Sequence, residues 1–151
     1  MNKKIKAVVF DAGGVITEWR KPLNKFLEQL GVSIEVWIRA IQPDEEKANK
    51  GLLGPDEYCQ RIMNRLGFSD QWQSLRRVMP GSFERIEPTF ELLEELKGKF
   101  RLAMLTNAFK GSVEELDKNT HHKQYFEQII DSSAVGMVKP EKEIFLLTCK
   151  R

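Results

Sequence analysis

The sequence is poor in cysteine and has no long apolar run, and both absences narrow the classes of protein it can belong to. Cys59 and Cys149 are the only two cysteines among 151 residues, and their wide spacing fits neither a disulfide framework nor a metal-ligand motif. We therefore expect reduced thiols and a cytoplasmic location. No segment approaches the ~20 apolar residues of a membrane helix, and the apolar run after the basic N-terminus is too short for a signal peptide.

An excess of charge of one sign is also missing. The formal net charge of +2 is too small to indicate nucleic acid or an anionic membrane as a partner. The segment "DAGGVI" lacks the G-x-G-x-x-G of a dinucleotide-binding turn, and no G-K-[ST] of a P-loop is present. The 41% of hydrophobic and 30% of charged residues are typical of a soluble globular protein, so the chemistry has to be sought elsewhere in the chain.

Alternating strand and helix signals predict an α/β fold. Pro88, the capping-box pair Ser112 and Glu115, and Pro140 each mark the start of a helix. Short apolar runs predict buried strands at 5–10, 100–105 and 127–131. Strands that alternate with helices in this way form a parallel sheet with right-handed crossovers.

The segment after the first strand reads differently, as helices alone. Amphipathic patterns separated by Gly, Pro or Ser predict helices at 22–31, 33–42, 54–67 and 69–79. We therefore expect an α/β domain formed by 1–18 and 82–151, with a helical domain of residues 19–81 inserted into it.

Chemically useful side chains follow the predicted strands. The first strand ends at Asp11, the second at Thr106 and Asn107, and Lys139 lies in the loop after the third. Ligands of open α/β sheets bind outside the carboxyl ends of the strands. A carboxylate, a hydroxyl, an amide and an ammonium at one edge suit phosphoryl transfer, with Mg²⁺ offsetting the charge that repels an anionic nucleophile from an anionic substrate.

Three segments carry a family resemblance. "VVFDAGGVIT", "LAMLTNA" and "GMVKPEKEIF" resemble, in this order, motifs I, II and III of the haloacid dehalogenase-like hydrolases. The helical insertion resembles the cap that follows motif I in this family, through "NKGLLGPDEYCQRI". The resemblance covers essentially the whole chain. It implies a Rossmann-like core, a cap, Mg²⁺ and phosphatase activity on a small phosphorylated metabolite through an aspartyl-phosphate.

The resemblance also implies roles for single residues. Asp11 is the nucleophile and a Mg²⁺ ligand, Thr106 hydrogen-bonds the phosphoryl group, and Lys139 pairs with both. Gly13 would offer its backbone carbonyl to the metal. The remaining substrate-binding positions are Asn107 and Gly14.

Two departures from the family pattern lower the expected activity. Gly13 stands where the phosphatases carry a second aspartate, the general acid/base, whose help is worth about 10²–10⁴-fold. The acidic pair of motif IV and its strand are absent after Lys139, so we expect a truncated member with an incomplete metal site. In the family's strand order that strand lies beside the first one. The edge of the first strand is then exposed and available for self-association.

Simpler interpretations stand beside these. Asp11 could cap the turn that follows its strand, and Lys139 could be a solvated loop residue. His121 and His122 are expected to be solvated, and the three tryptophans and Cys59 to pack in the cap, with a weaker gating role for Trp19 and Arg20. Two further hypotheses about function remain: a dehalogenase, which needs no Mg²⁺, and a non-catalytic remnant that binds phosphate-bearing ligands or another chain.

Overall fold

The computed structural model describes residues 5–79 and 83–150, and within them the predicted parallel sheet is present. It contains β1 (Ala7–Phe10), β4 (Arg101–Thr106) and β5 (Gln128–Asp131) in the order β1-β4-β5. β1 pairs with β4 from Ala7 opposite Arg101 to Phe10 opposite Met104, and β4 pairs with β5 up to Thr106 opposite Asp131. All three predicted strands are present, but the first is not buried on both faces: Ala7 and Val9 are exposed, because β1 pairs with a neighbour on one side only in the described sheet.

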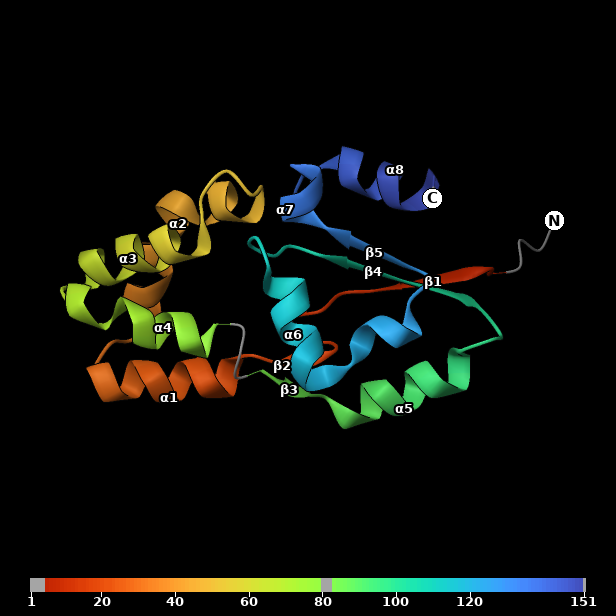
Figure 1. Ribbon diagram of the computed structural model, residues 1–151, viewed down its shortest axis with the longest axis horizontal. Helices are drawn as coiled ribbons and strands as arrows, with labels where there is room; N and C mark the ends of the chain where they lie inside the picture. Colours follow the sequence, from red (N-terminus) through yellow and green to blue (C-terminus); the bar gives the residue numbers. More distant parts are fainter. Residues whose placement is uncertain (1–4, 80–82, 151) are drawn as a thin grey trace.

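Helices cover both faces of this sheet (Figure 1). On one face lie α5 (Glu87–Leu96) and α6 (Ser112–Thr120); on the other lie α7 (Ser132–Val135) and α8 (Lys142–Lys150). The alternation of side chains along β4 explains this division, because Leu102 and Met104 pack toward α5 and α6 while Leu105 packs against Ile144 of α8. The result is a three-layer α/β fold, as the sequence predicts.

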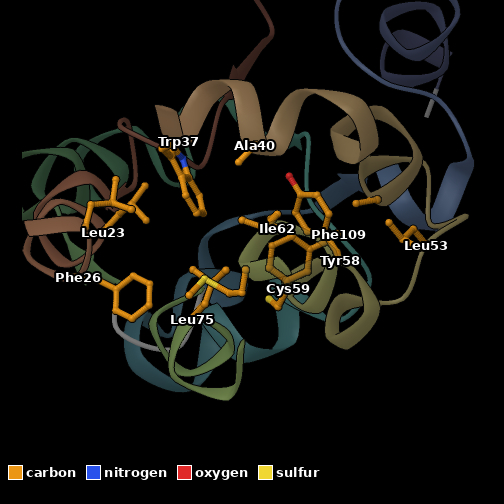
Figure 2. Packing of buried hydrophobic residues seen from close by; sticks show 13 residues of the cluster. Leu23, Phe26, Trp37, Ala40, Leu53, Tyr58, Cys59, Ile62, Leu75 and Phe109 are labelled. Carbon is orange, nitrogen blue, oxygen red and sulfur yellow. The ribbon is translucent and has the colours of Figure 1, made fainter. Parts of the chain in front are cut away.

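The helical insertion consists of α1 (Arg20–Leu30), α2 (Ile34–Asn49), α3 (Pro55–Leu66), the 3₁₀ helix η1 (Ser69–Gln71) and α4 (Trp72–Val78). Its hydrophobic cluster, in which Trp37, Cys59 and Leu75 are almost completely buried, also includes Phe109 from the loop after β4 (Figure 2). Trp19 and Trp72 pack against this cluster, as predicted. Burial raises the pKa of the Cys59 thiol to about 12, so this cysteine stays a neutral packing residue.

A short antiparallel pair, β2 (Thr17–Glu18) and β3 (Glu84–Arg85), joins the two ends of the insertion to the rest of the fold. Its strands are two residues long and carry no periodic signal, so the sequence did not indicate them. They tie the entry and exit of the insertion together. The division into two domains stays a prediction, and its boundary at 81 and 82 lies outside the described residues.

Helix α2 runs seven residues past its predicted end at 42 and contains Pro43. A proline inside a helix removes one backbone hydrogen bond, and tertiary contacts hold the helix together here. Asp44 is buried and accepts hydrogen bonds from Arg61 and Arg65 of α3, and Ala48 is completely buried. The two arginines lie 17 and 21 residues beyond Asp44 in the chain, which is why local rules place the end of the helix too early.

Two further expectations are wrong. His122 is fully buried rather than solvated: α6 ends before His121, and His122 begins the 3₁₀ helix η2 (His122–Tyr125). Its Nδ1 lies 2.8 Å from the Oγ1 of Thr120, and burial lowers its pKa. Ser112 does begin α6, but the N-cap is Gly111, so the capping box does not form.

β1 lies at one end of the described sheet and pairs with β4 on one side only. Val9 on this strand is 48% exposed. Self-association through this edge stays a prediction. No helix in the described residues is long and apolar enough to cross a membrane.

Candidate active site

The carboxyl ends of the three parallel strands meet at the edge of the sheet that faces the helical insertion (Figure 1). Asp11 directly follows β1, and Thr106 is the buried last residue of β4. Because Phe10 pairs with Met104, Asp11 and Thr106 lie at the same end of neighbouring strands. Lys139 reaches this edge from the loop between α7 and α8.

Asp11 and Lys139 form an ion pair. Lys139 Nζ lies 2.7 Å from Asp11 Oδ1, which also accepts a hydrogen bond of 2.7 Å from the backbone N–H of Ala12. Nζ also donates to the carbonyl of Leu105 at 3.2 Å. Lys139 is therefore not a solvated loop lysine. Among the described contacts only Oδ1 of Asp11 is engaged, and the side chain is 44% exposed, so the second oxygen is free to meet a ligand.

Asn107 holds the backbone of Lys139 from both sides. The N–H of Lys139 donates to Asn107 Oδ1 at 2.8 Å, and Asn107 Nδ2 donates to the carbonyl of Lys139 at 3.0 Å. Such a paired contact fixes the lysine loop against the end of β4. The amide is engaged with protein rather than open to a ligand, so contact between Asn107 and substrate stays a prediction, and the structure shows a positioning role.

The loop after Asp11 is a tight turn. The carbonyl of Ala12 accepts hydrogen bonds from the three residues at 15–17, and the N–H of Gly14 donates to the carbonyl of Thr17 at 2.8 Å. Gly14 has a φ of +77°, which favours glycine, and its N–H is already used within the turn. Gly13 faces the indole of Trp19, where a Cβ on Gly13 would lie 3.4 Å from Nε1. The substrate contact of Gly14 stays a prediction.

The protein donors expected to hold Mg²⁺ are few. They comprise the carboxylate of Asp11 and the carbonyl of Gly13, and no group of three or more Asp, Glu, His or Cys suited to a metal occurs in the described parts of the chain. Asp131, at the end of β5, caps α7 through hydrogen bonds from the N–H and Oγ of Ser133, both of 2.8 Å. Burial raises its pKa. Mg²⁺ commonly takes one or two carboxylates, waters and substrate phosphate oxygens, and the donor set fits that mode.

The helical insertion is held beside this edge by contacts that local sequence rules did not reveal. Ser132, completely buried at the start of α7, donates to the carbonyl of Asn49 at 2.6 Å and accepts from the N–H of Ala108 at 2.9 Å. Lys50 forms an ion pair of 2.6 Å with Glu141. One serine hydroxyl therefore connects the end of α2 with the loop that follows Thr106.

Fold and site together define a Rossmann-like α/β protein in which a carboxylate and a lysine meet at the carboxyl end of a parallel sheet. The sequence profile described as haloacid dehalogenase-like hydrolase matches residues 5–151. The chain belongs to the haloacid dehalogenase-like hydrolases.

Solved structures agree with this assignment. A HAD (haloacid dehalogenase) family enzyme from Bacteroides thetaiotaomicron, crystallised with magnesium and inorganic phosphate, is 26% identical, with 97% of this chain and 78% of that chain covered and a TM-score of 0.70. An L-2-haloacid dehalogenase from Xanthobacter autotrophicus, with chloropropionic acid covalently bound, is 18% identical, with 97% and 64% covered and a TM-score of 0.72. The second likeness shows the fold alone. No curated protein sequence matches this chain.

Proposed function

We propose that this chain hydrolyses a small phosphate monoester, with Asp11 as the nucleophile. The observation that carries the proposal is the ion pair of 2.7 Å between Asp11 and Lys139, which leaves one carboxylate oxygen unengaged among the described contacts. The Bacteroides relative was crystallised with magnesium and inorganic phosphate, which supports the same substrate class for this family member. The unpaired cysteines support a reducing, cytoplasmic setting.

The reaction proceeds in two displacements. The free oxygen of Asp11 attacks phosphorus, the ester P–O bond breaks, and the bonding electrons leave with the alcohol oxygen, which takes a proton from water. A water molecule then attacks the aspartyl-phosphate, which releases inorganic phosphate and restores the carboxylate. The ammonium of Lys139 and the hydroxyl of Thr106 stabilise the negative oxygens of the transferring group. When bound by Asp11 and the Gly13 carbonyl, Mg²⁺ supplies further positive charge.

Gly13 favours dehalogenation as a second candidate function. A halide leaves carbon without a proton, so the absence of an acid at position 13 does not slow that reaction, whereas it does slow the departure of an alcohol. The dehalogenase from Xanthobacter carries its substrate carbon covalently bound, which agrees with this chemistry. In this chain Asp11 would displace the halide, and water would hydrolyse the resulting ester.

The test is phosphate release from p-nitrophenyl phosphate with Mg²⁺ or with EDTA. We expect metal-dependent release that Asp11→Asn abolishes, while Asp70→Asn, at an exposed position in η1, leaves it unchanged. Halide release from 2-chloropropionate that persists in EDTA would replace the phosphatase by the dehalogenase. A folded chain that releases neither product would show a binding protein without catalysis.

A further inference from the structure

A cavity of about 540 Å³ lies between the helical insertion and the carboxyl edge of the sheet. Its wall includes Ala12 and Gly13, which directly follow Asp11, and Thr106 at the end of β4. The cavity therefore begins where the reacting phosphoryl group would sit. Its volume lies within the range of pockets that enclose an organic ligand, and it is larger than a phosphate group alone requires.

The far wall of the cavity is a stripe of half-exposed isoleucines on α2. Ile34, Ile38 and Ile41 are spaced by four and three residues, so they share one face of the helix, and all three line the cavity. Ile34 is 43% exposed and Ile38 51% exposed, although α2 also has a buried face that contains Trp37 and Ala40 (Figure 2). Apolar side chains thus face the cavity as well as the core of the insertion.

A buried hydroxyl in the same wall has no partner. Ser112, at the first turn of α6, is 8% exposed, and its Oγ forms no hydrogen bond within the described residues. It lines the cavity together with Val113. A buried hydroxyl is normally hydrogen-bonded, because leaving it unpaired costs free energy. This second observation is independent of the isoleucine stripe. The Oγ itself is almost inaccessible in the free protein, so a ligand group would pair with it once the Ser112 side chain turns toward the cavity.

We propose that this cavity binds the alcohol part of the phosphate monoester, and that this part is an apolar ring system with one hydrogen-bonding group that pairs with Ser112. The inference rests on the proposed function only for the position of the phosphate. An apolar ring matches the isoleucine stripe and the indole of Trp19, which packs beside Gly13. Polar side chains such as Arg20, Asn24 and Glu45 also line the cavity, but the isoleucine stripe offers no partners to the hydroxyls of a sugar or polyol phosphate.

Binding is measured by calorimetry with phosphonates, which carry a C–P bond that hydrolysis does not cleave. The full chain should bind 1-naphthylphosphonate at least about tenfold more tightly than methylphosphonate. Ile38→Gln should weaken naphthylphosphonate by about tenfold and leave methylphosphonate unchanged. The matched control is Val36→Gln, because Val36 is 39% exposed on the same helix and does not line the cavity. Equal affinity for the two phosphonates, or equal effects of the two variants, would overturn the proposal.

Ser112→Ala separates a ligand contact from a structural role. A structural hydroxyl would leave the free protein less stable when it is removed, whereas an unpartnered one should leave it as stable or more stable. Naphthylphosphonates with and without a ring hydroxyl complete the test. At one ring position the hydroxyl should improve binding several-fold in the wild type and not in Ser112→Ala. A Ser112→Ala protein that is less stable, with no ring hydroxyl that depends on Ser112, would contradict the pairing.

Kinetics separate the failure of this site from the failure of the proposed function. If no ester releases phosphate, but the chain still binds naphthylphosphonate preferentially and Ile38→Gln removes this preference, the binding site is supported and the proposed catalysis is wrong. If naphthyl and methyl phosphate are hydrolysed with equal kcat/KM and their phosphonates bind equally, catalysis stands and the site falls.

Discussion

Replacing Gly51 with alanine should destabilise the contact between the helical insertion and the sheet. Gly51 follows α2 with a φ of +71°, and a Cβ at this position would clash with the backbone carbonyl oxygen of Ser133. This approach is too close for any Cβ, and the obstacle is backbone. The neighbouring contacts between Asn49 and Ser132 and between Lys50 and Glu141 depend on the same approach.

The expected cost has two parts. A positive φ costs an alanine about 1 kcal/mol relative to glycine. Overpacking against a rigid neighbour adds about 1–3 kcal/mol. The free energy of unfolding of Gly51→Ala should therefore fall by about 2–4 kcal/mol. Gly31→Ala is the matched control, because Gly31 also follows a helix with a positive φ of +65° but nothing lies within 4 Å of the added Cβ. It should lose only the first part.

Urea denaturation of the wild type and both variants measures the two costs. Because α2 lines the cavity, Gly51→Ala should also weaken naphthylphosphonate binding, whereas Gly31→Ala should not. Equal losses of stability in the two variants would refute the close approach of Gly51 to Ser133 and, with it, the seating of α2 against the sheet.

Three further outcomes are expected. Gly13→Asp adds a carboxylate beside Trp19, where a Cβ makes an ordinary contact of 3.4 Å, and it should raise kcat for phosphate release by about 10²-fold or more. Gly13→Asn, which adds no acid, should not raise kcat. Equal kcat values for the two variants would show that proton transfer from this position does not limit turnover. Asn107→Asp removes the hydrogen-bond donor to the Lys139 carbonyl. It should lower kcat/KM about tenfold with little change in the urea midpoint of unfolding. An unchanged kcat/KM would argue against a role of Asn107 in positioning Lys139. Burial lowers the pKa of His122 from its ordinary 6.5, so the unfolded chain binds a proton that the folded chain does not, and stability should fall as the pH drops from 7 to 5. His122→Gln should lose less stability over this interval in parallel urea titrations, and identical pH dependence would mean that His122 titrates normally.

Much of the fold could be predicted from local patterns. The strands near 5–10, 100–105 and 127–131 show as short apolar runs, although only the second is largely buried and Val9 of the first is 48% exposed. The alternation of strands and helices then predicts a parallel sheet, with a ligand site at the carboxyl ends of its strands, next to Asp11 and Thr106. The pair of Asp11 and Lys139 followed from the family resemblance, and the structure places the two side chains in contact.

The features that escaped prediction all depend on residues far apart in the chain. The burial of His122 depends on α6 ending at Thr120, and the continuation of α2 past Pro43 requires Asp44 to meet two arginines of α3. The hydrogen bonds between Asn107 and the backbone of Lys139 also join residues 32 positions apart, and the sequence did not indicate them. No local rule contains these partners.

The sequence by itself determined the three strands of the parallel sheet, most of the helices, their order and the residues at the strand ends, because hydrophobic periodicity, helix-start signals and motif spacing act over a few residues. Only the tertiary structure decided where the helical insertion sits, through Ser132 and Gly51, and how that position encloses an apolar cavity beside Asp11. A cavity is the space left between elements after they pack. Its shape and its unpartnered hydroxyl therefore depend on contacts between distant segments, which only the folded chain brings together.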